Sequence, residues 1–595
     1  MKITPNSLTL NQLLGSANEQ FAVPAYQRRY SWRVRQIDEL IDDIDLLDGS
    51  DVHLLGSIVC LTGHHTAGIN KLELVDGQQR LTTLCIILEC IRQKLALDNE
   101  IEHATELGRL LSCKAFGGSA LPKIALDSID GTEYQRLIDK DFDESSDVFV
   151  NQNLYDAFDH LRTWIEDLSI EQIGRFLYKL QNQALIIRLD VGDAKDAFKL
   201  FETINNRGLR LSPTDIIKNF VLGNAARFGN EQLEQARNSW ALLIKFLDGS
   251  DSDAFFRYYL ISKTERRITK AQVIFEFKAL FMNQVEEAKT LPDRHLYADE
   301  EETSDEELDE VTAIDDVVLP VRDEARIPFK QFLSHVVKSA KVFGEIIHVS
   351  SGDKKIDRHL RNLRMIKSAQ TYGLLMHLRV GGLDDKTFVE VLKLTESFVL
   401  RRHVCRERAN ETETLFAKLC GVDRSNPIDE IKRAYREASP SDERFKLDFA
   451  SANFTSNIID RARYCLEQLE SKRHGKHVEL EVLGAEEVHV EHIIPQKIKT
   501  NKSKAEYGDW ETYLGDKVTL LHPRMVSRIG NLTLFAGALN IGASNNPFAN
   551  KKKSYQQSSI LITKELSDMP SFKFKHVEER SAELADLAVE RWPIP

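Results

Sequence analysis

The chain has few residues that could cross-link it or anchor it in a membrane. Its seven cysteines are an odd number among 595 residues and include no C-x-x-C pair, which excludes a disulfide framework and a cysteine-rich zinc site. The longest near-apolar run, Leu81–Ile91, is far shorter than the roughly 18 residues that span a bilayer. The start of the sequence lacks the cationic and apolar regions of an export signal. We therefore expect a cytoplasmic protein that makes no membrane contact.

Proline and glycine are also scarce, with 15 and 29 residues, whereas 42% of the residues are hydrophobic and 29% are charged. This balance excludes a disordered chain, a collagen-like chain and a membrane-embedded chain. A length of 595 residues allows three or more domains at roughly 100–200 residues each. The composition therefore predicts a globular protein with several domains and an ample core.

The net charge of −13, taken alone, disfavours a nucleic-acid partner, because a polyanion binds a basic surface. One segment carries most of that charge: residues 299–316 hold eleven acids and no base. Removing those eleven charges from −13 leaves only −2 for the other 577 residues. We interpret the segment as a solvated surface loop, with a DNA-mimicking or regulatory strip as the alternative. The rest of the chain is close to neutral and remains compatible with DNA.

Hydrophobic periodicity predicts three domains in a multidomain α+β chain. Residues 1–225 mix short strands with helices and read as an α/β domain. Residues 226–471 follow helical spacing and read as a helical middle domain, which contains the acidic loop 299–316. Residues 472–595 combine strand signals with the densest set of candidate catalytic groups.

Particular elements of the first domain can be placed by residue. The expected strands are Leu54–Leu61, Lys71–Val75 and Ala184–Leu189, and Leu81–Leu95 is expected to form a mostly buried helix. At residues 212–215, the order serine, proline, threonine, aspartate predicts a helix start: a hydroxyl cap, proline at the first helical position and an acid at the third.

The C-terminal region places a histidine and an acid at the end of an expected strand. Val488–Pro495 alternates like a strand until the proline ends it, so Glu491 and His492 fall at a strand-to-loop transition. A second strand is expected at 530–535, followed by a helix that opens near Asn540. Phosphodiester cleavage needs a base and a cation, and His492 can act as the base. The oxygens of Glu491 and Asn540 suit Mg²⁺ or Mn²⁺, whereas zinc is disfavoured because no cysteine or HExxH motif is nearby.

The order EHIIPQ, IGNLTL, a second asparagine and NNPFANKKKSY resembles the HNH (His-Me finger) nuclease domain at the C-terminus of GmrSD-type restriction proteins, over residues 475–595. The resemblance implies a ββα-metal fold with His492 as the general base. It further implies that Asn540 and Glu491 belong to the metal site and that Asn531 braces the loop that carries the histidine.

The same region is basic. Between residues 497 and 553 there are ten Lys or Arg against four acids, a local balance of +6. The contiguous Lys551, Lys552 and Lys553 are expected to attract a phosphate backbone. Four aromatic residues lie within this stretch or just after it, and both base stacking and packing between strands remain open for them: Tyr507, Trp510, Tyr513 and Tyr555.

Two N-terminal motifs suggest phosphate or base recognition. The first includes Tyr26, Gln27 and Arg28 within PAYQRRYSW, where guanidinium groups and aromatic rings are dense. In the second, an expected strand ends at Asp76-Gly77 and runs into a helix, so that backbone amides and Arg80 would face the same space.

Together, YQRRYSW, VDGQQRLTTL and FETINNRGLRLSPTDIIKN resemble the ParB/sulfiredoxin-like N-terminal domain of the same GmrSD-type proteins, over residues 8–225. The resemblance implies binding and hydrolysis of GTP or ATP by the residues of the DGQQR motif and of a later turn, and sensing of modified DNA by the QR motif. The first group is Asp76, Gln78, Gln79, Arg80, Asn206 and Arg207, and the second is Tyr26, Gln27 and Arg28. No Walker A motif occurs, so any use of a nucleoside triphosphate requires this different arrangement.

We therefore predict an NTP-dependent, metal-dependent endonuclease that cleaves modified double-stranded phage DNA in antiphage defence. One alternative is a nuclease that recognises phosphorothioate backbones, with NTP hydrolysis regulating its release. Another is a non-catalytic, regulatory DNA-binding protein. A homo-oligomer and a partner restriction subunit both stay open.

Overall fold

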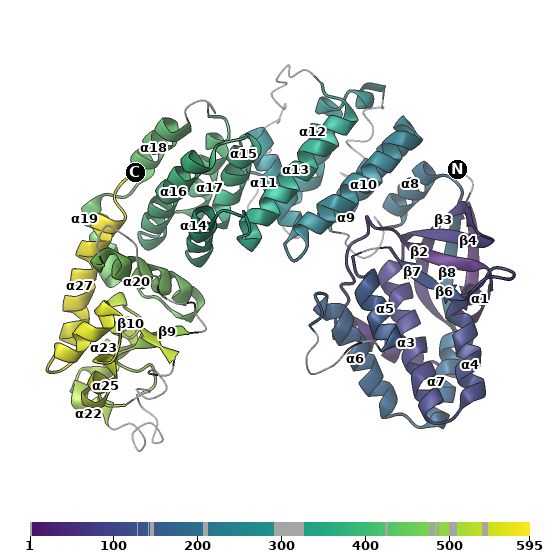
Figure 1. Cartoon of the computed structure of the whole chain (residues 1–595), viewed down its shortest axis with the longest axis horizontal. Helices are drawn as coiled ribbons and strands as arrows, with labels where there is room; N and C mark the ends of the chain where they lie inside the picture. Colours follow the sequence, from purple (N-terminus) through teal and green to yellow (C-terminus); the bar gives the residue numbers. More distant parts are fainter. Residues whose placement is uncertain are drawn as a thin grey trace. The chain divides into compact units, whose positions relative to one another are not determined.

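The computed structural model describes most of the chain in two compact units (Figure 1). Unit 1 comprises residues 1–257 and 269–341, and unit 2 comprises residues 258–268 and 342–595. The described residues are 3–127, 129–140, 142, 148–205, 212–290, 326–422, 427–474, 482, 484, 487–498, 509–537, 539 and 546–595. Five features named above lie outside them: Asn206, Arg207, Tyr507, Asn540 and the acidic segment 299–316.

A mixed six-stranded sheet forms the centre of the N-terminal part of unit 1. The strands, in spatial order, are β1 (Ile3–Thr9), β8 (Ala184–Val191), β3 (His53–Thr66), β4 (Ile69–Asp76), β2 (Glu19–Val23) and β7 (Ile124–Leu126). The β1–β8 and β3–β4 pairs are antiparallel, and the other three pairs are parallel. The three expected strands are confirmed within β3, β4 and β8, with β3 longer than predicted.

Helices cover both faces of this sheet. One face packs against a large apolar core to which the following helices contribute: α1 (Leu10–Leu14), α2 (Val34–Asp45), α3 (Gln78–Leu97), α4 (Ile101–Leu110), α5 (Gly131–Asp139), α6 (Gln152–Glu166) and α7 (Ile170–Asn182). Helix α8 (Ala194–Asn205) contacts β3, β4 and β8 and packs against α9 (Pro213–Phe228). The prediction of a buried helix is confirmed by α3, which has buried residues on nearly every side.

The predicted start of α9 is also confirmed. Ser212 is its N-cap and accepts a hydrogen bond from the Asp215 N–H at 3.1 Å, and Pro213 occupies the first turn. Further helices of unit 1 are α10 (Asn230–Leu247) and α12 (Val273–Gln284); α11 (Ser252–Thr264) and α13 (Phe329–His348) begin in unit 1 and end in unit 2. A short ribbon of β5 (Ser112–Cys113) and β6 (Leu121–Pro122) completes the strands described in unit 1.

Unit 2 begins with helices and ends with a small mixed region. The helices are α14 (Lys354–Met365), α15 (Tyr372–Val380), α16 (Asp385–Val404), α17 (Ala409–Leu419), α18 (Pro427–Ala438), α19 (Asp442–Ser451) and α20 (Ile459–Arg473). The antiparallel strands β9 (Val488–His492) and β10 (Leu532–Ala536) follow, with α22 (Trp510–Leu514), α23 (Val518–Met525), α25 (Phe548–Tyr555), α26 (Leu561–Lys564) and α27 (Phe574–Arg591).

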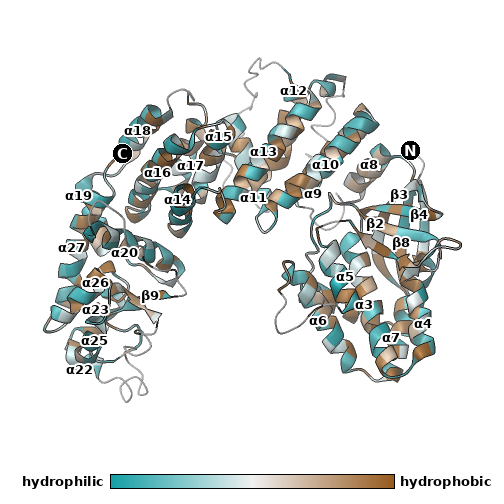
Figure 2. Ribbon diagram, viewed as in Figure 1, coloured by the Kyte–Doolittle hydropathy of each residue, from teal (hydrophilic) through white to brown (hydrophobic). Residues whose placement is uncertain are grey.

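The chain is thus a multidomain α/β protein with mostly helical content. Hydrophobic and hydrophilic residues alternate around the helices of both units (Figure 2). The expected helical middle region is helical where it is described, but the two compact units divide it between them. The three-domain division at residues 225 and 471 therefore remains a prediction. None of the helices in the described part of the chain has the length and apolarity needed to cross a bilayer.

Candidate functional site

Asn531 holds the loop that follows His492 in unit 2. Its side-chain Oδ1 accepts a hydrogen bond from the Ile494 N–H at 2.8 Å, and its Nδ2 donates to the Ile494 carbonyl at 3.0 Å. Its own carbonyl accepts from the Ile493 N–H at 2.9 Å, and its side chain is fully buried. Because a buried amide with several partners has one favourable orientation, Asn531 fixes the backbone two residues beyond His492.

Residues outside the expected motif secure this loop and the turn that contains Asn531. His522, which is buried on α23, makes a 2.8 Å hydrogen bond through Nε2 to the Pro495 carbonyl. Arg580 of α27 donates to the carbonyls of Gly530 and Leu532 at 2.9 and 2.7 Å. A Cβ at Gly530 would lie 2.2 Å from the carbonyl oxygen of Val577, so only glycine allows this approach. Sequence reasoning missed His522 and Arg580, which lie far from the motif in the chain.

His492 is the last residue of β9, and its ring is neutral. Burial, followed by the nearby charges of Lys551 and His522, lowers its pKa to about 4. Its Nε2 lies 3.0 Å from the Gln496 side-chain nitrogen. An amide nitrogen can only donate, so Nε2 is unprotonated and accepts this hydrogen bond through its lone pair. A water molecule that replaced the Gln496 amide could give a proton to this nitrogen.

Glu491 pairs with a lysine that the sequence suggested would face DNA. The Lys551 ammonium donates to Glu491 Oε1 and, at 3.0 Å, to the His492 carbonyl. Burial raises the pKa of Glu491 above its ordinary value despite the opposing charge of Lys551. Burial likewise lowers the pKa of Lys551, although Glu491 opposes that shift. This buried ion pair ties α25 to the end of β9.

The expectation that Lys551 contacts a phosphate backbone is therefore wrong for this structure, because its side chain is completely buried and its ammonium group is engaged. Lys552 is half-buried and Lys553 is exposed, so the expectation stays a prediction for those two. Of the aromatic residues in this region, Trp510 and Tyr555 are buried in its apolar core, which favours packing over base stacking.

The described residues supply only part of a metal site. Among them, no three His, Cys, Asp or Glu side chains gather as metal ligands would. Glu491 offers a hard carboxylate oxygen of the type that Mg²⁺ and Mn²⁺ prefer, but the Lys551 ammonium occupies it. Glu491 thus fits as one ligand only if Lys551 moves, and the other expected ligand, Asn540, lies outside the described residues.

In unit 1, the DGQQR segment holds the YQRRYSW segment in place. The Gln78 amide donates to the Arg28 carbonyl at 2.9 Å. The Gln79 side chain accepts from the Ser31 N–H at 2.7 Å and donates to the Arg29 carbonyl at 3.2 Å. The structure therefore brings the two motifs together, although they are about fifty residues apart in the sequence. Both glutamines act on the backbone of the loop at residues 28–31.

Gly77 forms the turn into α3 and packs closely against strand β3. Gly77 adopts φ +92°, and a Cβ there would lie 2.4 Å from Ile58 Cγ2, so two separate constraints require glycine. The Arg80 guanidinium donates to the Ser57 carbonyl at 3.0 Å. Burial lowers the pKa of Arg80, and the negative charge of Asp76 opposes this shift.

The three expected DNA-sensing residues have different environments. Gln27 is buried; its amide donates to the carbonyls of Leu74 and Val75, both at 3.0 Å, and its oxygen accepts from Lys218 at 2.6 Å. Tyr26 is buried and donates to Glu73 at 2.5 Å. Arg28 keeps half of its side chain exposed. Arg28 alone of the three can readily reach a partner from solvent.

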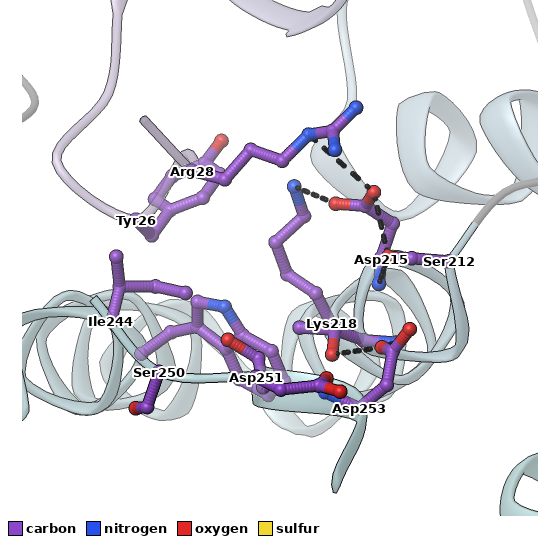
Figure 3. A pocket seen from close by; sticks show the side chains of 12 residues that line it. Tyr26, Arg28, Ser212, Asp215, Lys218, Ile244, Ser250, Asp251 and Asp253 are labelled. Atoms are coloured by element: carbon purple, nitrogen blue, oxygen red, sulfur yellow. Dashed lines mark hydrogen bonds and ion pairs between the residues drawn. The ribbon is translucent and has the colours of Figure 1, made fainter. Parts of the chain in front are cut away.

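A cavity of about 270 Å³ lies beside this loop, lined by Tyr26, Arg28, Ser212, Thr214, Asp215, Lys218, Trp240, Ile244, Ser250, Asp251, Ser252 and Asp253 (Figure 3). Figure 3 shows the Lys218 ammonium and the Arg28 guanidinium converging on Asp215, at 3.5 and 3.7 Å. Burial acts to raise the pKa of Asp215, but the two cations and the Ser212 hydroxyl outweigh it and lower that pKa.

Two further carboxylates of the cavity are engaged with backbone groups. Asp253 accepts hydrogen bonds from the Thr214 N–H and hydroxyl at 2.9 and 2.5 Å. Asp251 accepts from the N–H groups of Asp253 and Ala254, both at 3.0 Å. The cavity lining includes none of Asp76, Gln78, Gln79 and Arg80. The sequence signalled the capped start of α9, but not its approach to the loop that contains Asp251.

Two models of known protein families match this chain, one toward each end. Residues 10–222 match the model of the GmrSD restriction endonuclease N-terminal domain, and residues 439–587 match that of the GmrSD restriction endonuclease C-terminal domain. The second match begins well before residue 472, so it includes α19 and α20. A search of curated proteins finds no match. Because the two domain models occur in order and together cover more than half of the chain, the protein belongs to the GmrSD restriction endonucleases and is a DNA endonuclease.

Proposed function

We propose that this endonuclease cleaves modified phage DNA in antiphage defence, with its phosphodiester chemistry in unit 2 and a nucleoside triphosphate site in unit 1. The proposal rests on the pair of hydrogen bonds between the Asn531 side chain and the Ile494 backbone. They fix the loop directly after the neutral His492. A nuclease that uses a general base needs such a fixed, unprotonated group at its substrate-binding surface. The β9–β10 pair followed by α25 is consistent with the ββα arrangement of HNH nucleases.

In the proposed mechanism, water displaces the Gln496 amide from His492 Nε2 and donates a hydrogen bond to that nitrogen. His492 takes a proton from the water as the oxygen attacks phosphorus, the bond from phosphorus to the leaving sugar oxygen breaks, and that oxygen takes up a proton from solvent. Asn531 keeps the backbone of the loop in place. Glu491 and Asn540 would hold Mg²⁺ or Mn²⁺, which would neutralise charge on the phosphate. Lys551 must leave Glu491 for that ion to bind, and it remains within reach of the His492 carbonyl.

Cleavage assays test the assignment of His492. Wild-type protein, His492→Ala and His489→Ala are incubated with plasmid and with modified phage DNA, Mg²⁺ or Mn²⁺, and each nucleoside triphosphate. His489 is a matched control because it lies on the same strand and is exposed. We expect His492→Ala to lose cleavage at least a hundredfold, since general base catalysis contributes about 10²- to 10⁴-fold. Equal cleavage by wild type and His492→Ala would remove this residue from the reaction.

The proposed nucleotide site rests on the loop at residues 26–31, the DGQQR segment that holds it, and the adjacent cavity. Ligand pockets for drug-sized molecules usually measure roughly 300–1,000 Å³, so a cavity of about 270 Å³ suits part of a nucleotide. Arg28 and Lys218 supply two cations, which favour a phosphate group. Gln78 and Gln79 act in this proposal by positioning the loop. Arg80 holds the start of α3 against the Ser57 carbonyl of β3, and the charge of Asp76 favours its charged form.

Hydrolysis of GTP and ATP tests this second site. Arg80→Ala is expected to lower hydrolysis, but Arg80 also packs against Gly56, so Arg28→Ala supplies a second variant at an exposed position. Unchanged hydrolysis in both variants would remove the loop from the nucleotide site.

A separate comparison identifies the feature of the DNA that is recognised. Preferential cleavage of phosphorothioate-bearing DNA would indicate a backbone modification, whereas preferential cleavage of glucosylated-cytosine DNA would indicate a base modification.

A further inference from the structure

Helix α14 in unit 2 presents an exposed face made almost entirely of basic side chains. Residues 354–367 contain six bases and one acid, a local balance of +5 in a chain of net charge −13. Lys354, Lys355, Arg361, Arg364 and Lys367 are exposed, and Arg358 is half-buried. The opposite face is apolar: Ile356, Leu360 and Leu363 are buried. We call Lys354, Lys355, Arg358, Arg361, Arg364 and Lys367 the α14 basic row.

The acids close to this row are engaged elsewhere. Asp353 caps the helix: its Oδ1 accepts from the N–H groups of Lys355 and Ile356 at 2.7 and 3.0 Å. Asp357 accepts from the Ser351 N–H and hydroxyl at 2.8 and 2.7 Å. In the part of the chain that the structure describes, no carboxylate forms an ion pair with the row. A face that served only solubility would mix both signs, so this row is suited to an anionic partner.

The geometry of the row suits a regular polyanion. Arg358, Arg361 and Arg364 recur every three residues, and a helix rises about 1.5 Å per residue, so they are spaced roughly 4.5 Å apart along the axis. Each strand of duplex DNA carries one phosphate per roughly 3.4 Å of axis. A twelve-residue helix is about 18 Å long and can therefore lie beside several successive phosphates.

Contacts within unit 2 connect this row to the candidate nuclease site. Arg461 of α20 donates to the Ile366 carbonyl just after α14, at 3.1 Å. Two residues further along α20, Arg463 donates to the Val488 carbonyl at the start of β9. Helix α20 thus joins the end of α14 to the strand that ends in His492.

We propose that the α14 basic row binds the phosphate backbone of double-stranded DNA and holds the substrate on the unit that contains His492. The proposal rests on the function proposed above and adds a substrate-binding surface outside both sequence motifs. We choose duplex DNA as the ligand because the chain is a DNA endonuclease and the positive charges of the row complement the negative phosphates of the DNA backbone.

The test measures DNA binding by fluorescence anisotropy in full-length protein with the His492→Ala background, from 50 to 300 mM salt. The charge-neutral variant combines Arg358→Gln, Arg361→Gln and Arg364→Gln. The matched control removes three exposed bases elsewhere in unit 2, with Lys386→Gln, Lys393→Gln and Arg433→Gln. A third protein replaces the three arginines of the row with lysine, which keeps the charge.

We expect the charge-neutral variant to bind a 30-base-pair duplex at least about tenfold more weakly near physiological salt. The slope of log affinity against log salt should fall in magnitude by roughly 2 to 3, at about 0.9 for each lost phosphate contact. The control variant and the lysine variant should bind DNA with nearly the affinity and the salt slope of the parent His492→Ala protein. Unchanged binding, or equal losses in the charge-neutral variant and the control, would overturn the proposal. Failure of the proposed function would instead appear as cleavage that persists in His492→Ala, so the two failures are distinguishable.

Discussion

Two buried lysine–carboxylate pairs, one in each unit, differ in the balance of charge around the acid. In unit 1, Asp215 faces both Lys218 and Arg28, and its pKa is lowered despite burial. In unit 2, Glu491 faces Lys551 alone, and burial raises its pKa despite that partner. Burial lowers the pKa of both lysines.

The two charge balances allow different ligands to bind. Two cations face Asp215, so one of them can turn to an anion such as a phosphate group while the other still neutralises Asp215. The other two carboxylates of the cavity, Asp251 and Asp253, accept hydrogen bonds from backbone N–H groups. At Glu491 one cation balances one acid, so a second cation can bind only by displacing Lys551. The first pair therefore suits anion binding, and the second suits exchange between an internal ammonium group and an external metal ion.

The largest expected effect comes from breaking the ion pair between Lys551 and Glu491. Lys551→Met leaves Glu491 buried without its cation and should destabilise the β9–α25 region by about 3–5 kcal/mol. Hydrogen exchange of the β9 and β10 amides measures that opening free energy locally. Adding Glu491→Gln should recover most of the loss, because no buried charge then remains. A loss below about 1 kcal/mol would show that the pair does not hold this region.

Acidification should destabilise unit 2 before it affects the pair in unit 1. His403 is neutral when folded: burial, followed by the charge of Arg461, lowers its pKa to about 4, against an ordinary 6.5. The unfolded chain therefore takes up this proton first, and stability present above pH 6.5 is lost as the pH falls toward 4. At pH 4.5 the loss should be about 2–3 kcal/mol. Asp215, with its lowered pKa, should weaken unit 1 only below its ordinary value of 3.8.

Thermal unfolding at pH 7 and pH 4.5 measures this loss when wild type is compared with His403→Asn. Asparagine can still donate to the Ile366 carbonyl, as His403 Nδ1 does at 3.0 Å, but it does not titrate. The variant should lose less stability than wild type on acidification. If wild type and His403→Asn lost the same stability between pH 7 and pH 4.5, folding would not lower the pKa of His403.

Breaking the pair in unit 1 should have a smaller effect. Lys218→Met removes the donor to Gln27 and one cation from Asp215, but Arg28 and the Ser212 hydroxyl remain. We expect a loss of about 1–3 kcal/mol, because the acid keeps partners. Hydrogen exchange of the α9 amides measures this loss. If it equals or exceeds the effect of Lys551→Met, the contrast between the two pairs is wrong.

The smallest effect should come from the exposed neighbour of Lys551. Lys553→Gln should weaken DNA binding a few-fold and lower the magnitude of the salt slope by about 1, while exchange of the β9 amides stays unchanged. Anisotropy titrations at several salt concentrations provide the measurement. If Lys553→Gln destabilises β9 as Lys551→Met does, the distinction between a buried and a surface lysine on α25 is not valid.

The sequence was sufficient where a local pattern determines the structure. Ser212 and Pro213 define the start of α9, and the alternation at Val488–His492 defines β9, because caps and strand periodicity depend on near neighbours. Lys551 was misassigned because three contiguous lysines resemble a surface patch. Its helical spacing from Phe548 and Tyr555, three and four residues away, places it on their buried face and was the available signal.

Contacts between distant segments could not be predicted in this way. The approach of Asp253 to Thr214, and of Lys218 to Gln27, depends on how α9 packs against α8, α10 and α12. The braces from His522 and Arg580 likewise come from helices with no recognisable motif. The motifs indicated which segments matter, and packing determined which of their side chains face the cavity, the core or the solvent.

The central claim is that His492 acts as the general base of the nuclease reaction. The most direct measurement is the single-turnover cleavage rate of His492→Ala with and without added imidazole, with NTP hydrolysis followed in the same reactions. We expect a rate at least a hundredfold below that of His489→Ala, partial recovery with imidazole, and NTP hydrolysis close to wild type. Cleavage by His492→Ala at the wild-type rate would contradict it.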